Sequence, residues 1–190
     1  SYTLTGTGAD TYVWTGGVTD NVPFTPASTA TYTVTGTITA TGCSNTADIT
    51  VTVNPLDNPA FTTTDFCAGT PSTTPTVTGL AGGTFAFNPL PGDGATINAA
   101  SGAISNGVGG TTYTIEYTTN GACPQSSTQT ITVNALPVVD VPDASVCTGG
   151  TVSLTATGAS TYTWSPGTYL DVTTGGTVNT TPAVDIVYTV

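Results

Sequence analysis

The sequence predicts an all-β protein built from tandem immunoglobulin-like sandwich modules that form a rod, and three observations support this prediction. Long stretches alternate apolar residues with Thr, which is the pattern of a strand with one buried face. Turn residues (Gly, Pro, Asn, Asp) interrupt these stretches about every 8–12 residues, as in a sandwich of short strands. Finally, landmarks in the chain recur at one fixed spacing, which is typical of repeated modules.

The cysteines set the period of the repeat. Cys43 and Cys123 are 80 residues apart, and so are Cys67 and Cys147. The flanking text agrees, because "ITVTVNPL" before the middle module is matched by "TITVNAL" at its end. The 190-residue chain therefore divides into three modules. These are a partial module that lacks its first strand (1–54), a complete module (55–134), and a partial module that lacks its last hairpin (135–190).

An early strand pair opens the first and third modules. "TLTGTGADTYVW" at 3–14 nearly recurs as "SLTATGASTYTW" at 153–164. We expect the two alternating stretches on either side of Gly158 to pair with each other around that turn. Trp14 and Trp164 occupy matching places and are predicted core residues, with a sugar-stacking platform as the less favoured alternative. The middle module carries a variant at 82–104 instead of the Trp strand.

A late hairpin follows in each module that contains it. In the first module, residues 30–40 and 47–53 alternate apolar residues with Thr, and "TGCSNT" between them supplies turn residues. Tyr32, Tyr113 and Tyr188 share one position before this hairpin. We expect these tyrosines to pack in the core with the hydroxyl bonded to a nearby turn.

The charge of the chain limits its function. Eleven acidic residues and no Lys, Arg or His leave a net charge of −11. Such a chain offers no cation to phosphate, so neither nucleic acid nor anionic lipid is an expected partner. The commonest general bases are absent as well, and Glu116 is the only Glu, so we predict no enzymatic activity. No apolar run approaches the roughly 20 residues of a membrane span, and no membrane insertion is expected.

The cysteines also predict cross-links. A disulfide between Cys67 and Cys123 would close a loop of about 57 residues, which stabilises a module by about 4 kcal/mol in the chain-entropy model. The alternative is two free buried thiols. Cys43 and Cys147 have no partner within their own modules. Their partners are expected outside the 190 residues, in a longer repetitive chain, although end-to-end bonding of Cys147 to Cys43 of a second subunit is an alternative. Disulfides would indicate an oxidising, extracellular compartment.

Three long stretches resemble Ig-like and PKD-like repeat modules of giant cell-surface adhesins and secreted multidomain proteins of the Bacteroidetes. They are "SVCTGGTVSLTATGASTYTWSPG", "FTPASTATYTVTGTITATGCSNTADITVTVNPL" and "TTYTIEYTTNGACPQSSTQTITVNALP". The resemblance covers nearly the whole chain as a style of module. It implies export by the type IX secretion system, a place on the cell surface, and service in adhesive filaments such as those of gliding motility. The C-terminal sorting domain of that family does not occur in these residues.

The predicted function is a disulfide-stabilised stalk in an extracellular filament or giant adhesin, with neighbouring repeats or like subunits as partners. The alternative is an accessory carbohydrate-binding or spacer module of a secreted hydrolase, for which surface glycans would be the partners. No cofactor is expected. Structural calcium at the linkers is a subsidiary hypothesis that rests on Asp57, Asp140 and Asp143. Prolines restrict φ in both linkers and predict semi-rigid joints, at Pro55, Pro59, Pro137 and Pro142.

Overall fold

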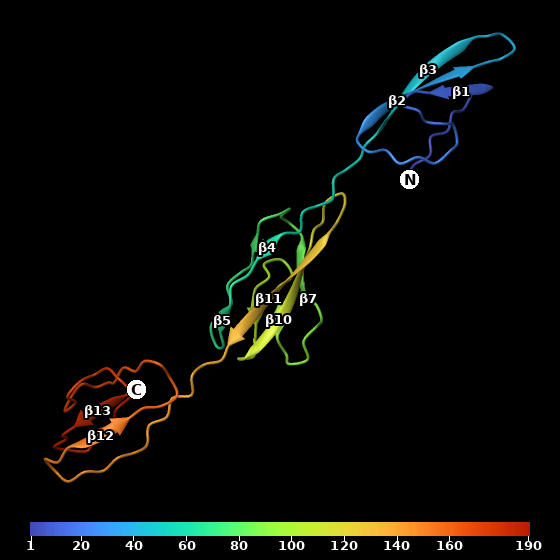
Figure 1. Cartoon of the computed structure of the whole chain (residues 1–190). Coiled ribbons are helices and arrows are strands. Elements are labelled where there is room, and N and C mark those ends of the chain that lie inside the picture. The colour runs from blue at the N-terminus through green and yellow to red at the C-terminus, as the bar shows by residue number, and fades with distance from the viewer.

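The computed structural model describes residues 1–190 and contains thirteen β-strands and no helix, which confirms the predicted all-β fold class. Three β-rich bodies follow one another along an extended rod, with the N-terminus in the body at one end and the C-terminus in the body at the other (Figure 1). We call them modules 1, 2 and 3 in chain order. No helix is long and apolar enough to cross a membrane.

Module 2 is a two-layered sandwich. One layer is a four-stranded sheet in the order β5-β11-β10-β7, in which β11 runs parallel to β5 and antiparallel to β10. Two short pairs, β4-β6 and β8-β9, complete the module. The strands are β4 (Phe61–Thr62), β5 (Phe66–Cys67), β6 (Thr76–Val77), β7 (Thr84–Phe87), β8 (Thr96–Ile97), β9 (Ile104–Ser105), β10 (Thr111–Thr118) and β11 (Ser126–Asn134).

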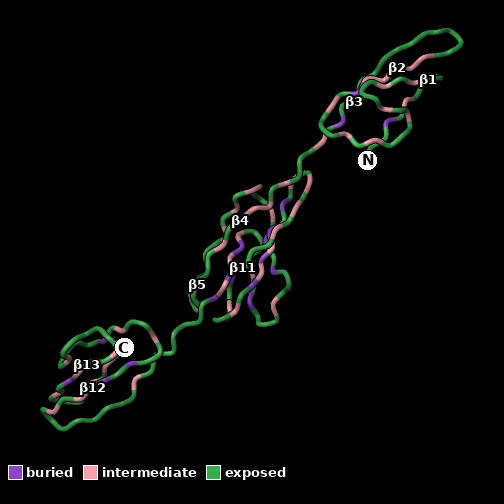
Figure 2. The backbone as a smooth tube through the Cα atoms, viewed as in Figure 1, coloured by how far each residue is buried: buried purple, intermediate pink, exposed green.

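The largest core of the chain lies between these layers. Alternate residues of β7, β10 and β11 point inward, so that Ile115 and Val133 are completely buried. Aromatic rings fill the rest of the space, with Phe61 and Phe85 in an edge-to-face contact at 5.5 Å between ring centroids. Eleven buried residues form this core, and Figure 2 shows buried backbone along its central strands.

Module 1 has one three-stranded antiparallel sheet, β1-β2-β3. Its strands are β1 (Thr11–Trp14), β2 (Ala30–Thr37) and β3 (Ser44–Val51). The hairpin predicted from residues 30–53 is confirmed, because β2 and β3 pair along their whole length and a six-residue turn joins them. Only Leu4, Tyr32 and Val51 are buried in its core, against which Trp14 packs.

Module 3 contains β12 (Val152–Thr155) and β13 (Thr177–Thr180), which pair with each other. The predicted pairing across Gly158 is therefore wrong. After Gly158 the chain turns away from β12, and residues beyond it form single bridges elsewhere, Thr163 to Thr174 and Ser165 to Thr189. Alternation shows that two segments each have one buried face, but it does not show which segments pair.

Two matched positions, one in module 1 and one in module 2, differ in burial. Ile131 on β11 pairs with Tyr113, and Ile49 on β3 pairs with Tyr32, so the two isoleucines occupy the same place in their modules. Ile131 is 1% exposed, whereas Ile49 is 39% exposed. The difference arises because Ile131 packs in the eleven-residue core of module 2, whereas Ile49 lies outside the three-residue core of module 1, on the edge strand β3.

Candidate functional site

The joint between modules 1 and 2 is clipped to the turn of the β10–β11 hairpin. The Asp57 backbone N–H donates to the Cys123 carbonyl at 3.0 Å, and the Asp57 carboxylate accepts the Gly121 N–H at 2.9 Å. On the same turn the Cys123 Sγ lies 3.6 Å from the Asn54 carbonyl oxygen. The linker is thus bonded directly to the module that follows it.

The joint between modules 2 and 3 is held by close backbone contact. Asp140 and Thr157 exchange two backbone hydrogen bonds, of 3.1 and 3.0 Å. Beside them, Gly158 packs so tightly on the linker that an added Cβ would lie 1.7 Å from the Val138 carbonyl oxygen. Gly158 also has a φ of +95°, a backbone conformation that residues other than glycine rarely adopt. Only glycine fits this position, and it seats the linker against module 3.

The repeated early segment forms the same local corner in both outer modules. The Tyr12 hydroxyl accepts the Ala9 N–H and donates to the Ala9 carbonyl, and the Tyr162 hydroxyl makes the same two bonds to Ala159. Each bond is 2.6 or 2.7 Å long. The repeat in the sequence therefore encodes a structural corner, in which a tyrosine holds the turn before it.

The tryptophans differ in exposure. Trp164 is 3% exposed and its Nε1 donates to the Gly175 carbonyl at 2.9 Å, as expected for a core residue. Trp14 is half-buried against the core of module 1, and its Nε1 donates to Asp20 at 2.8 Å. Burial removes Trp164 as a platform for sugar stacking.

The three tyrosines before the late hairpin differ in burial and in hydrogen bonding. Tyr32 and Tyr113 are buried and Tyr188 is half-buried. The Tyr113 hydroxyl donates to Asp93 at 2.5 Å and accepts the Val108 N–H at 2.9 Å. The Tyr188 hydroxyl donates to the Thr168 carbonyl at 2.8 Å. Bonding to a turn is thus confirmed for the two later tyrosines, whereas the Tyr32 hydroxyl makes no hydrogen bond.

Most of the carboxylates hold loops, a role that the sequence did not reveal. Asp10 accepts both the N–H and the hydroxyl of Thr39, and Asp171 accepts the N–H groups of Val172 and Asn179. These hydrogen bonds lower the pKa of Asp10 and that of Asp171 below the usual value. These acids act as caps for backbone donors. Glu116 instead accepts a hydrogen bond from the side-chain amide of Asn88, the residue that follows β7.

In module 2, Asp93 links a loop to the core. The hydroxyl of Tyr113 and the N–H of Ala95 lower the pKa of Asp93. Burial, together with the bond to Asp93, raises the pKa of Tyr113. Asp93 lies in a Gly-Asp-Gly segment, which signals a turn but gives no indication of the partner.

We expect acid to loosen this loop in a way that depends on Asp93. Because its pKa is lower in the folded state than the ordinary 3.8, the bond contributes stability that is present above pH about 4 and is lost as the pH falls through the lowered pKa. Hydrogen exchange at Val108 and Ala95 should accelerate over that range. Asp93→Asn should flatten the pH dependence, whereas Asp185→Asn, at an exposed carboxylate without a hydrogen bond, should leave it unchanged; equal profiles for all three chains would contradict the assignment.

The three acidic residues considered for linker calcium, Asp57, Asp140 and Asp143, have different surroundings. Asp57 binds the Gly121 N–H, the Asp140 backbone pairs with Thr157, and Asp143 lies on the wall of a groove described below. No group of three or more His, Cys, Asp or Glu side chains lies close enough together to hold a metal ion. The linker carboxylates therefore form no calcium cage in this structure.

The predicted Cys67–Cys123 disulfide is contradicted by the structure, in which all four cysteines are free thiols. Cys67 lies opposite Asn134 at the end of β11, whereas Cys123 lies in the turn before β11 begins. A strand of nine residues separates the two cysteines by about 25–30 Å, but a disulfide requires Cα atoms about 4.4–6.8 Å apart. The matched spacing reflects the repeat rather than a bond. The alternative of buried thiols is also wrong for Cys67, which is exposed.

We expect every cysteine of the native chain to react with a thiol reagent without prior reduction. Cys43, Cys67 and Cys147 are exposed and Cys123 is half-buried beside Asn54, so Cys123 should react most slowly. Intact mass after treatment with iodoacetamide should show four additions, both with and without a reductant. A chain that gains two additions only after reduction would show that a disulfide had formed.

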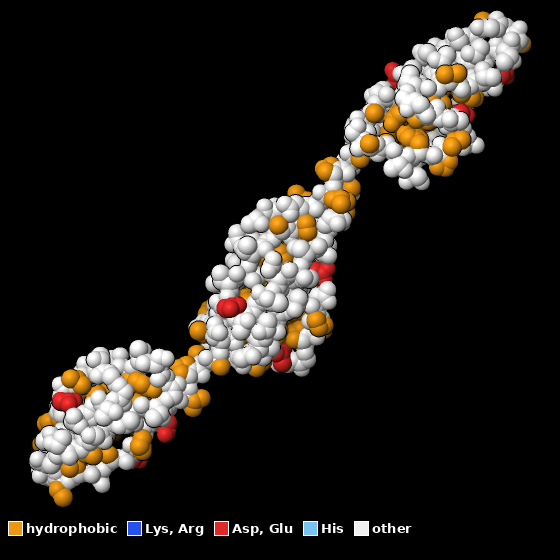
Figure 3. Space-filling view, viewed as in Figure 1, with side chains coloured by type: hydrophobic (Ala, Val, Ile, Leu, Met, Phe, Trp, Pro, Cys, Tyr) orange, Lys and Arg blue, Asp and Glu red, His pale blue; other side chains and the backbone are white.

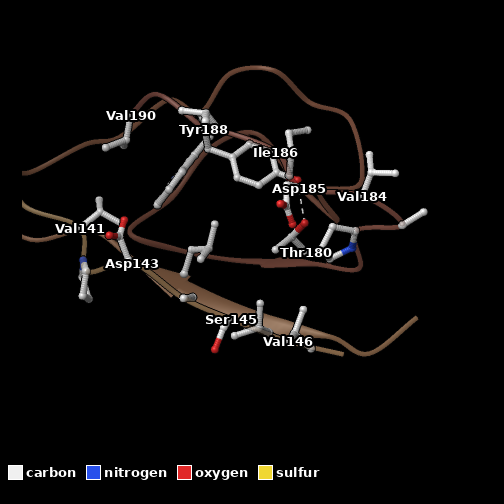
Figure 4. A pocket seen from close by; sticks show the side chains of 18 of the residues that line it. Val141, Asp143, Ser145, Val146, Thr180, Val184, Asp185, Ile186, Tyr188 and Val190 are labelled. Carbon is white, nitrogen blue, oxygen red and sulfur yellow. Dashed lines mark hydrogen bonds between the residues drawn. The ribbon is translucent and has the colours of Figure 1, made fainter. Parts of the chain in front are cut away.

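A groove crosses module 3 (Figure 4). Residues 141–146 and 148 form one wall, and residues 182–188 and 190 form the other. Val152, Leu154, Trp164 and Thr180 complete the lining, around a volume of about 460 Å³. Twelve of its nineteen lining residues are hydrophobic. A hydrogen bond of 2.7 Å between the hydroxyls of Thr180 and Tyr188 ties the second wall to β13. Sequence analysis did not reveal this groove.

Comparisons with known proteins do not assign the chain to a family. No protein family and no curated protein matches the chain. Among solved structures, the protocadherin GammaB4 extracellular domain is similar at 14% identity and a TM-score of 0.35, over 83% of this chain and 34% of that one. The extracellular cadherin domains 1–5 of protocadherin Gamma B2 are similar at 14% identity and a TM-score of 0.33, over 82% and 38%.

The chain thus spans little more than a third of the length of these structures. Their identity and TM-scores are too low to transfer a role to this chain. Neither structure bears on the resemblance to Bacteroidetes adhesin repeats or on type IX export, which stay predictions from the sequence. The functional argument below therefore rests on the chain itself.

Proposed function

We propose that this chain is a structural and adhesive repeat region of an extracellular cell-surface stalk or filament, with module boundaries at 54/55 and 134/135. One observation carries the proposal: three separate cores follow one another in a rod, and each linker is bonded to the module that follows it. Such a chain gains reach from every added module. Its partners would be neighbouring repeats or like subunits.

The surface supports a mechanical role. The space-filling view shows three lobes in line, a surface with scattered acidic groups and no basic side chain (Figure 3). A uniformly negative rod resists collapse onto itself and offers no cationic site for phosphate. Lineage among the Bacteroidetes, type IX export and a link to gliding motility follow from the sequence resemblance and belong to this proposal.

The carbohydrate-binding alternative has less support. A sugar platform needs an exposed aromatic face, and Trp164 is buried. Trp14 is half-buried and bonded to Asp20. No specific feature of the structure favours this alternative over the stalk.

Two measurements on the whole chain test the proposal. Small-angle scattering should give the profile of an extended rod, and a compact globular profile would contradict the stalk. A glycan array probed with the same chain should remain silent. Reproducible binding to one glycan class would favour the carbohydrate-binding alternative, and a point mutant of Trp14 would then show whether that side chain carries it.

A further inference from the structure

We propose that module 2 contains a mechanical clamp, formed where residues 59–68 lie alongside β11, which resists a force that pulls the two ends of the module apart. The inference rests on the proposed stalk function, because a stalk transmits pulling force along its length. It adds which contacts bear that force. All of these contacts lie between the two linkers, within module 2.

The two segments of the clamp run in the same direction along its whole length. β5 pairs with the end of β11 as a parallel strand, with Phe66 opposite Val133, 67 residues further along the chain. Before β5, three hydrogen bonds also join residues that are 67 or 68 positions apart. This nearly constant offset shows that the parallel arrangement continues back to Pro59.

Before β5, hydroxyl groups join the two segments. The Ser127 hydroxyl donates to the Pro59 carbonyl at 2.6 Å, and the Thr63 hydroxyl donates to the Thr130 carbonyl at 2.9 Å. The backbone of β4 pairs with β6 rather than with β11. Side chains therefore take the place of backbone pairing along this part of the clamp.

The contact becomes a backbone pairing at β5. Just before this strand, the Thr132 N–H donates to the Asp65 carboxylate at 2.7 Å. Just after it, the Ala68 N–H donates to the Asn134 carbonyl at 2.9 Å. The bonds of the clamp are thus spread over residues 127–134, nearly the full length of β11.

The same segment anchors two aromatic rings in the core. Phe61 is 2% exposed and Phe66 is 8% exposed. Phe61 packs on Phe85 and Tyr117, at 5.5 and 5.9 Å between ring centroids. Sliding the segment along β11 would draw both rings out of the core, so apolar burial opposes this movement together with the hydrogen bonds.

Tension along the rod acts on all of these bonds together. The chain enters module 2 beside Cys123, in the turn before β11, and leaves it after Asn134, at the other end of β11. A pull between modules 1 and 3 (Figure 1) draws residues 59–68 toward module 1 and β11 toward module 3. Parallel segments pulled in opposite directions slide past each other, so the bonds between them share the force and break nearly together.

The clamp is the weaker of the two attachments of β11. Release of residues 59–68 breaks the contacts described above and the short β4–β6 pair. Release of β11 would also break its eight-residue register with β10. We therefore expect forced unfolding to begin with the clamp, while the β10–β11 ladder is still intact.

The test is force spectroscopy of the full chain, held at its two ends under constant force. The step of module 2 is recognised by the release of residues 55–134, at most about 290 Å of extended chain. Thr63→Val removes the bond to Thr130 at nearly constant volume, and Asp65→Ala removes the acceptor of the Thr132 N–H. Each variant should unfold at least about threefold faster under force.

Each variant has a control with the same substitution in the same module. Thr112→Val removes a hydroxyl contact of 3.1 Å across the β10–β11 ladder. Asp93→Ala removes a carboxylate that accepts the Ala95 N–H at 3.0 Å. Neither contact joins residues 59–68 to β11, and both persist when the clamp breaks. The controls should therefore lose stability without force, measured by hydrogen exchange of β10, but keep the unmodified rate of forced unfolding.

The proposal is overturned if the two clamp variants unfold under force at the unmodified rate, or if their controls accelerate as much as they do. Either result would leave the stalk function standing, because small-angle scattering tests the rod shape independently. A compact scattering profile would contradict the stalk and would not alter the comparison of unfolding rates.

Discussion

Ile131→Ala should destabilise module 2 by about 2–4 kcal/mol. The side chain is 1% exposed and packs in the eleven-residue core, so its loss removes apolar burial and leaves a cavity that the surrounding rings fill poorly. The effect should be confined to module 2, because each module has its own core. Hydrogen exchange of the full chain in denaturant, read separately for β10, β2 and β12, measures the loss module by module.

Ile49→Ala provides the matched control. It makes the same change at the equivalent position of module 1, where the side chain is 39% exposed on the free edge of the sheet. We expect a cost of less than about 1 kcal/mol, since most of the side chain is already in contact with water. Equal losses at the two positions would show that β3 is covered in solution and would contradict the described edge.

Gly158→Ala should release the linker from module 3. A Cβ at this position would lie 1.7 Å from the Val138 carbonyl oxygen, and the residue would also have to keep a φ of +95°. Backbone must shift to relieve the contact, and the paired bonds of Asp140 and Thr157 are the neighbouring bonds at risk. The combined cost of the strained φ and the lost bonds is about 3 kcal/mol or more.

Exchange of the Asp140 and Thr157 amides should become fast in this variant, and small-angle scattering should show a broader range of bend at the second joint. Gly8→Ala separates the two causes, because Gly8 occupies the same position of the repeat with a φ of +89° and nothing within 4 Å of the added Cβ. It should cost only the φ strain, about 1–2 kcal/mol. Similar costs for both variants would refute the packing role of Gly158. Trp164 fluorescence checks that module 3 itself remains folded.

Local features were the most predictable from the sequence. Alternation and a polar six-residue turn were enough to predict the β2–β3 hairpin, because both strands and their connection lie within about 24 residues of chain. The repeated early segment likewise marked one recurring structure, which is the corner held by Tyr12 and Tyr162. In both cases the residues that specify the structure lie within the short segment that forms it.

Long-range pairing was less predictable. β12 was expected to pair with the segment next to it, but it pairs with β13, and β11 pairs with the distant β5. The prediction of a Cys67–Cys123 disulfide was wrong for the same reason. Spacing along the chain does not show which end of a sandwich each residue occupies. Cys67 and Cys123 were separated by a full strand.

By itself, the sequence determined the all-β class, the 80-residue spacing of its landmarks, the charge of −11 and the β2–β3 hairpin with its turn. These properties depend on composition and on short-range alternation. Only the tertiary structure decided that the thiols are free, that Gly158 fastens a joint, that the carboxylates cap loops and that module 3 carries an open groove. Those properties depend on contacts between segments that are distant in the sequence. The residues around each side chain do not show which distant residue it contacts.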